Sequence, residues 1–112
     1  MFDAQILPAG TAVYSPWFAR GGDYARFTVD VIEYSLGGND LSVQFFTKNS
    51  EDTGDGVLAS GSPTISRSAT GRETAECDNL EELVRYKFTA GGTTGQVLFR
   101  MLTPVWFDAV AP

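Results

Sequence analysis

Histidine is absent from the 112 residues of this sequence, and cysteine occurs once, as Cys77. Without histidine the chain cannot form a Ser-His-Asp triad or a Cys-His pair, and the commonest zinc ligand is missing. A single cysteine also excludes an internal disulfide. Cys77 lies between Glu76 and Asp78, whose negative charges disfavour the thiolate that a nucleophile needs. We therefore expect no catalytic residue, and we interpret Cys77 as a buried, inert thiol.

Basic residues are scarce as well. Eight Lys and Arg stand against fourteen Asp and Glu, so the formal net charge is −6. Such a surface repels phosphate backbones and anionic lipids, and we expect neither a nucleic acid nor a membrane as partner. No stretch approaches the roughly 18 consecutive apolar residues of a transmembrane helix. The first residues, MFDAQILPAG, lack the basic start and long apolar run of a signal peptide, so we expect them to be structured.

Glycine and proline, with 12 and 5 residues, are frequent enough to divide the chain into short segments. Between them, apolar and polar residues alternate with the period of two that is typical of strands. In 25–31 the apolar residues share one side, and after Val31 the phase slips by one residue. This slip predicts a β-bulge near Val31–Ile32, or a strand that crosses between sheets. Further alternating segments are 32–36, 41–45, 84–88 and 97–101.

Turn signals separate these segments. Asp78 and Glu81 have the spacing of a capping box, which predicts a single helical turn at that point. The remaining signals predict hairpin turns at GGND (37–40) and GGTTG (91–95), one or two short strands over 57–66, and an exposed turn with an edge strand over 67–76.

The length suits one domain. We predict an all-β fold: a sandwich of seven to eight short antiparallel strands, of Greek-key or jelly-roll type, with at most one short helical turn. A small closed barrel is the second possibility. The domain spans residues 1–112. Its apolar ends, about 1–10 and 104–112, are predicted to be arms that become ordered on a partner.

The most polar stretch is NSEDTGDG, residues 49–56. An EF-hand calcium loop needs oxygen ligands at positions 1, 3 and 5, Gly at 6 and a bidentate Glu at 12. Counting from Asn49, the first positions fit, but position 12 is Ser60. We therefore interpret the stretch as a solvated loop and expect no tightly bound metal and no cofactor. Glu51, Asp52 and Asp55 are the weak candidates for a looser cation site.

The aromatic residues are the strongest signal for binding. In a β-sandwich such residues usually belong to the core, but exposed ones act as sugar-stacking platforms or protein-interface anchors. Two groups follow a proline, which favours a position at the surface. The predicted interface anchors are the apolar groups outside the regular alternation: Phe2, Ile6, Trp17, Phe18, Trp106 and Phe107.

The segment 79–108, NLEELVRYKFTAGGTTGQVLFRMLTPVWFD, resembles the C-terminal half of small phage and prophage β-sandwich proteins encoded among virion structural genes. These are similar to the capsid decoration, or cement, proteins of tailed phages. The matching elements are NLEELVRYKFT, VLFRMLTP and the closing WFD; the first half, with WFARGGDYARFTVDV, agrees more loosely. The resemblance implies a β-sandwich without enzyme activity on the outer face of a capsid shell.

Two functions follow as expectations. The first is a phage decoration protein located on the virion, which binds the outer surface of the major capsid protein shell and stabilises it; copies of the same chain on the shell are further expected contacts. The alternative is a carbohydrate-binding module or virion adhesin that uses Trp17 or Trp106 as a stacking platform. The missing histidine and cofactor motifs disfavour an enzyme.

Overall fold

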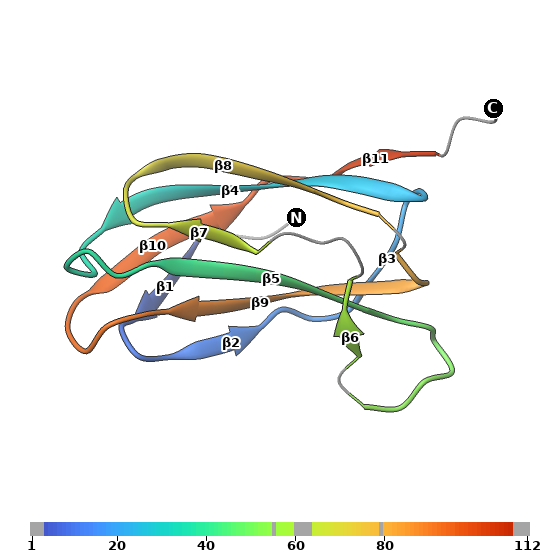
Figure 1. Ribbon diagram of the computed structural model, residues 1–112, viewed down its shortest axis with the longest axis horizontal. Coiled ribbons are helices and arrows are strands. Elements are labelled where there is room, and N and C mark those ends of the chain that lie inside the picture. Colours follow the sequence, from blue (N-terminus) through green and yellow to red (C-terminus); the bar gives the residue numbers. More distant parts are fainter. Residues whose placement is uncertain (1–3, 55, 60–63, 79, 109–112) are drawn as a thin grey trace.

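The computed structural model describes residues 4–54, 56–59, 64–78 and 80–108. Within these ranges the chain forms strands and no helix, and all strand pairs are antiparallel (Figure 1). The strands are β1 (Gln5–Pro8), β2 (Ala12–Tyr14), β3 (Phe18–Ala19), β4 (Tyr24–Tyr34), β5 (Leu41–Lys48), β6 (Val57–Leu58), β7 (Ile65–Arg67), β8 (Gly71–Cys77), β9 (Leu83–Ala90), β10 (Gln96–Met101) and β11 (Val105–Phe107).

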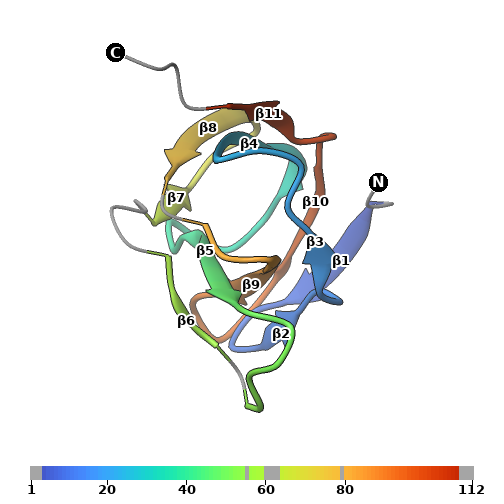
Figure 2. The same ribbon diagram turned by 90° about the vertical axis from the view of Figure 1, so that its right-hand side faces the viewer.

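The strands form two layers. In the first layer β1, β10 and β4 lie side by side, β11 continues the line of β10 along β4, and β8 pairs with the other edge of β4. In the second layer β9 and β5 are central; β2 and β3 share one edge, and β6 and β7 share the other. Figure 2 looks along the strands and shows β8, β4 and β11 above β5, β9 and β2.

The order of the strands is that of a jelly roll. Three pairs of strands, β10 with β11, β2 with β3 and β6 with β7, each occupy one position in a layer. With each pair counted as one strand, the order β1-β10-β4-β8 faces the order β2-β9-β5-β7. Almost every connection crosses from one layer to the other, as happens when an antiparallel ribbon wraps around a core. The predicted all-β sandwich is therefore confirmed, and jelly-roll is the applicable type among the alternatives.

The two predicted hairpin turns are wrong in one respect. GGND links β4 to β5 and GGTTG links β9 to β10, and in both cases the two strands belong to different layers. The turns themselves are present, with positive φ at glycines such as Gly38 (90°) and Gly92 (86°). Local sequence thus identified the reversal of the chain but not the layer that the next strand joins.

The predicted β-bulge is confirmed. Leu98 pairs with Glu33 while the next residue, Phe99, pairs with Val31, so Ile32 is the extra residue on β4. Ile32 is consequently turned outward and is 43% exposed. The segments 57–66 and 67–76 also follow the prediction, with β6 and β7 in the former and the edge strand β8 in the latter; residues 60–63 lie outside the described ranges.

The predicted helical turn is wrong. Asp78 and residues 80–82 carry no helix, and Asn79 lies outside the described residues. The amide of Glu81, which a helix would have capped locally, donates instead to Oγ1 of Thr47 on β5 (2.7 Å), and that hydroxyl donates to the Leu83 carbonyl (2.9 Å). A buried side chain distant in sequence therefore satisfies this backbone and holds it extended.

The core lies between the two layers and is rich in aromatic rings. Phe27 of β4 stacks on Phe45 of β5 at 4.9 Å, and Phe88 of β9 packs against Phe99 of β10 at 4.8 Å. These rings have no exposed surface. The alternating residues of 25–31, 41–45, 84–88 and 97–101 that were predicted to point inward are buried, and each large side chain contributes roughly 1.5–3 kcal/mol by leaving water.

Tyr86 lies at the centre of this core and carries a hydroxyl into it. Burial, and to a smaller degree the nearby Cys77, raises the pKa of Tyr86 far above its ordinary value of about 10. The unfolded chain releases this proton from about pH 10, whereas the folded chain retains it. Stability is therefore complete below pH 10, and we expect it to fall above that value by up to about 1.4 kcal/mol per pH unit.

Urea unfolding of the wild type and Tyr86→Phe between pH 8 and 11 checks this expectation. All other titrating groups are common to both proteins, so the difference between the two slopes isolates Tyr86. We expect a shallower decline in the variant. Equal slopes would show that the folded state releases the Tyr86 proton as readily as the unfolded one does.

The segments predicted as terminal arms are strands over part of their described length. Gln5–Pro8 pairs with β10, and Val105–Phe107 pairs with the start of β4. Residues 1–3 and 109–112 lie outside the described ranges. No described helix is long and apolar enough to cross a membrane.

Candidate functional site

Aromatic rings and cations share the outer face of the second layer, which we call the cation–aromatic face. Alternation along β9 sends Val84, Tyr86 and Phe88 into the core and therefore Arg85 and Lys87 outward. Strand pairing places Phe46 opposite Arg85 and Tyr14 opposite Lys87. The face consists of Tyr14, Trp17, Phe46, Lys48, Arg85 and Lys87.

A break in the edge strand positions Trp17. Pro16 has no amide hydrogen, and the chain is not in strand conformation between β2 and β3. Buried Ser15 bridges the gap, because its amide donates to the Tyr86 carbonyl (2.9 Å) and its hydroxyl accepts from the Tyr86 amide (2.9 Å). A methyl group on Gly56 would lie 2.7 Å from the Trp17 ring, so the backbone there closely adjoins the indole.

The cations lie over the rings. The Arg85 guanidinium is 3.9 Å from the centroid of Tyr14 and 4.6 Å from that of Trp17. Nζ of Lys48 is 4.7 Å from the Trp17 centroid and also donates to the Gly54 carbonyl (3.2 Å). Each such contact at a partly exposed site contributes about 0.5–1 kcal/mol. The rings thereby hold the positive groups in place at the surface.

Charge is unevenly distributed between the two outer faces. Lys48 and Lys87 are the only lysines in the sequence, and both belong to the cation–aromatic face. The outward positions of β5 and β9 carry no carboxylate: they are Ser42, Gln44, Phe46, Lys48, Leu83, Arg85, Lys87 and Thr89. On or beside the first layer, by contrast, cations are paired with acids: Arg26–Glu76, Arg67–Glu73, Arg72–Asp30 and Arg100–Asp30.

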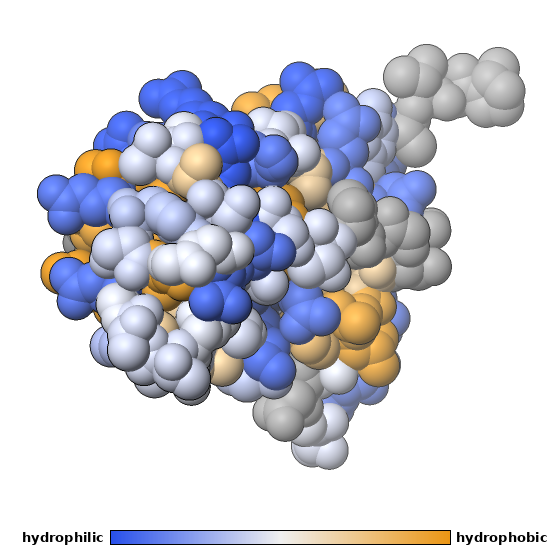
Figure 3. All heavy atoms as spheres, turned by 60° about the vertical axis from the view of Figure 1, so that its left-hand side comes forward, coloured by the Kyte–Doolittle hydropathy of each residue, from blue (hydrophilic) through white to orange (hydrophobic). Residues whose placement is uncertain are grey.

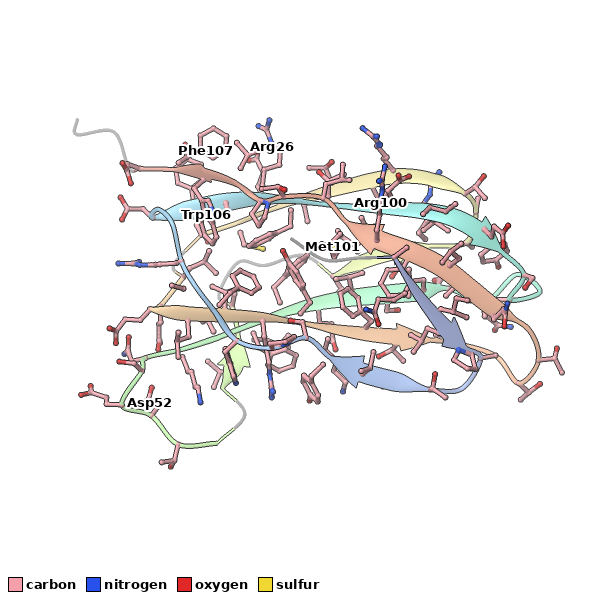
Figure 4. The ribbon with its side chains drawn as sticks, turned by 180° about the vertical axis from the view of Figure 1, so that it is seen from behind. Arg26, Asp52, Arg100, Met101, Trp106 and Phe107 are labelled. Carbon is pink, nitrogen blue, oxygen red and sulfur yellow. The ribbon has the colours of Figure 1, made fainter. Side chains whose placement is uncertain are left out.

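The structure separates the residues predicted as interface anchors. Trp17 lies on the cation–aromatic face, half-buried. Phe18 and Trp106 pack against the core; the Phe18 ring is 5.2 Å from Tyr86, and the Trp106 ring is 5.9 Å from Phe27. Figure 4 shows Trp106 pointing between the layers and Phe107, the next residue, pointing away from them.

Two further predicted anchors, Phe107 and Ile6, belong to the opposite side of the molecule. Phe107 stacks on Tyr24 at 5.0 Å on the outer face of the first layer, and Ile6, which is 58% exposed, lies on that face opposite Leu98. Phe2 lies outside the described residues. The described anchors therefore form no single surface.

Sequence reasoning did not select Phe46, Lys48, Arg85 and Lys87 as site residues. The outward phase of the predicted strand 84–88 was the signal for Arg85 and Lys87, whereas Phe46 and Lys48 lie beyond the predicted strand 41–45, because β5 continues to Lys48. That phase predicts a solvent-facing side chain but does not reveal that β5, β9 and β2 are neighbours. The face becomes visible only once the pairing of these strands is known.

The loop 49–54 is held by hydrogen bonds within the loop and by others to Glu82. Oδ2 of Asp52 accepts from the Asn49 amide (3.1 Å), and the Asp52 amide donates to the Asn49 carbonyl (3.0 Å); Asp52 is labelled in Figure 4. Glu82 accepts from both the amide and the hydroxyl of Ser50 (3.1 and 3.2 Å). Among the described residues no three carboxylates or thiols converge as metal ligands, and Asp55 lies outside them. The expected absence of a tightly bound metal stays a prediction.

Comparison with known proteins adds no relative. No protein-family model matches this chain, and no curated protein matches it. A functional hypothesis therefore depends on the chain's own surface and on the sequence resemblance described above.

Proposed function

We propose that this protein is a decoration (cement) protein of the tailed-phage type. It binds the outer surface of a shell of major capsid protein and stabilises that shell, without catalysis and without a cofactor. The observation that carries the proposal is the cation–aromatic face. Tyr, Trp and Arg are the residues enriched at protein–protein hot spots, and here Tyr14, Trp17 and Arg85 lie together on the outer side of the second layer.

Two further observations support the proposal. The segment 79–108 resembles small virion β-sandwich proteins, and it contains β9, the central strand of the proposed contact face. The jelly roll is also a fold of viral capsid domains, although the same fold occurs in lectins, so this second point is an analogy of fold alone.

Sugar binding through an exposed tryptophan receives less support. Trp106 packs against the core, and the ring of Trp17 already has Lys48 and Arg85 over it. A sugar needs an open ring face on which to stack. A sugar would compete with these cations for Trp17 and with the core contacts of Trp106, so the structure supports the carbohydrate-binding hypothesis less than protein docking.

Co-sedimentation with assembled shells tests the proposal. The chain is mixed with shells of the major capsid protein encoded beside its own gene, and bound protein is measured after gradient centrifugation. We expect saturable binding at a fixed number of copies per shell and a higher melting temperature of the decorated shell, because a ligand that binds only the assembled state stabilises it.

The control is an equally acidic protein of similar size, which should remain at the top of the gradient. Shells that neither retain the chain nor gain stability would contradict the proposal. Tight and selective binding on a glycan array, together with a neighbouring glycosidase gene, would favour the carbohydrate-binding alternative.

A further inference from the structure

We infer that the cation–aromatic face is the docking surface of this protein and that its partner is an acidic, partly apolar protein surface. On the proposed function, on which the identity of the partner rests, this surface is the exterior of the capsid shell. The face toward the shell is then the outer side of the second layer, rather than the terminal segments.

Charge complementarity carries the inference. The whole chain has a formal net charge of −6, yet Lys48, Arg85 and Lys87 lie together and the outward positions of β5 and β9 around them hold no acid. A partner rich in carboxylates is therefore attracted to the outward side of these two strands and repelled by the acidic surface, which begins beside Lys48 at Glu51 and Asp52. Such asymmetry selects one orientation of docking, because like charges brought together cost several kcal/mol.

An apolar component adjoins the cations. Leu58 of β6 pairs in register with Phe46, and Leu58 and its neighbour Val57 are 52% and 62% exposed. Elsewhere on the molecule, the view of Figure 3 shows exposed hydrophobic residues as separate patches among hydrophilic ones. A partner that combines carboxylates with a few apolar groups matches the cations of the face together with the exposed side chains of Leu58 and Val57.

The geometry favours a protein over a polysaccharide. The ammonium groups of Lys48 and Lys87 lie over the rings of Trp17 and Tyr14, so charged groups, rather than open ring faces, are presented to a partner. Carboxylates can pair with these groups directly, and the rings beneath them limit the loss of side-chain entropy. The domain measures 46 × 30 × 23 Å, so one broad side can supply the roughly 800 Å² that a stable interface needs from each partner.

Charge reversal on the face is the first test. Lys48→Glu combined with Lys87→Glu changes the charge by −4 at two side chains that form no ion pair with a described carboxylate. The matched control, Arg26→Glu with Arg72→Glu, makes the same change on the opposite face. We expect the first variant to bind shells at least about tenfold more weakly and the control less than about threefold more weakly. Cooperative melting of both variants well above the assay temperature establishes that they are folded, since the control also loses the Arg26–Glu76 and Arg72–Asp30 pairs.

A probe that does not depend on the shell is the second test. Fluorescently labelled poly-L-glutamate stands in for an acidic polypeptide, and its anisotropy is measured with each protein at low and at physiological salt. We expect the wild type and the control variant to bind at low salt, binding to weaken as salt rises, and the face variant not to bind. Heparin and single-stranded DNA are titrated in parallel.

The outcomes separate the two proposals. Shells that bind the face variant as well as the wild type would overturn the docking face and leave the decoration function intact. If shells bind no form of the chain but poly-L-glutamate still binds through Lys48 and Lys87, the decoration function is contradicted. The inference that the face binds acidic polypeptides is then retained. Binding of heparin or DNA but not of poly-L-glutamate would overturn an acidic protein as the partner.

Discussion

Replacing Trp106 with alanine is expected to lower the free energy of unfolding by about 3 kcal/mol and to leave shell binding by the folded fraction unchanged. The indole is half-buried and closes one end of the core: its ring is 5.9 Å from Phe27 and 6.4 Å from Phe18, both in edge-to-face geometry. Gly21 lies so close that an added methyl would be 2.7 Å from the ring. Truncating a large aromatic in such a setting costs about 3–5 kcal/mol, and partial exposure places Trp106 at the lower end.

Phe107→Ala is the matched control for this prediction. Phe107 follows Trp106 on the same strand but faces outward, where it stacks on Tyr24 and has the Arg26 guanidinium 5.4 Å from its ring centroid. We expect its loss to cost less than about 1.5 kcal/mol. Urea unfolding measures both variants, and co-sedimentation with shells measures their attachment. Trp106→Ala that melts like the wild type but detaches from shells would restore Trp106 as an interface anchor.

Period-two alternation carried most of the information about the fold. The inward residues of β4, β5, β9 and β10 are buried as predicted, and even the change of phase at Val31 corresponds to the bulge at Ile32. A strand in a sandwich has one face in the core, so the polarity of each residue indicates whether its side chain faces the core or the solvent. The local sequence does not indicate which strands are neighbours in a sheet. The two turns predicted as hairpins therefore turned out to cross between layers.

The failed helical turn has a similar cause. Asp78 and Glu81 satisfy a local capping rule, but the amide of Glu81 finds a better acceptor in Thr47, which is 34 residues away along the chain. A propensity rule weighs only near neighbours, whereas a buried hydroxyl that is already positioned by β5 offers a hydrogen bond shielded from water. Tertiary contact therefore overrides the local preference.

The interface anchors show where residue type ceases to predict exposure. Trp17 and Phe18 are adjacent in the sequence, yet one lies on an outer face and the other against the core, because successive residues of an extended chain point in opposite directions. The same alternation separates Trp106 from Phe107. A proline before each pair favours a position at the surface, but this prediction holds only for Trp17 and Phe107, because the direction of each ring depends on the register of the strand that follows.

Gly95→Ala is expected to be about as damaging as the loss of Trp106, with a cost of about 3 kcal/mol and a fall in melting temperature of at least about 10 °C. Gly95 has a φ of 94°, in the left-handed region where an alanine costs about 1–2 kcal/mol. In addition, its Cβ would overlap the carbonyl oxygen of Ser35. That oxygen belongs to the backbone, so relief requires the β4–β5 turn to move, which adds about 1–3 kcal/mol.

Gly37→Ala separates these two contributions. Gly37 also has a positive φ, of 63°, and it lies in the same β4–β5 turn, but nothing is within 4 Å of the position that its Cβ would occupy. It should therefore show the backbone cost alone, about 1 kcal/mol.

The Ala9 amide donates to the Gly95 carbonyl (3.0 Å), and Ser35 exchanges backbone and side-chain hydrogen bonds with Gln96. A displacement at Gly95 therefore disturbs the hydrogen bonds of β1 and β10. We expect the backbone amides of these two strands to exchange faster in Gly95→Ala but not in Gly37→Ala. Equal losses of stability in the two variants would mean that the turn yields to the extra methyl without resistance.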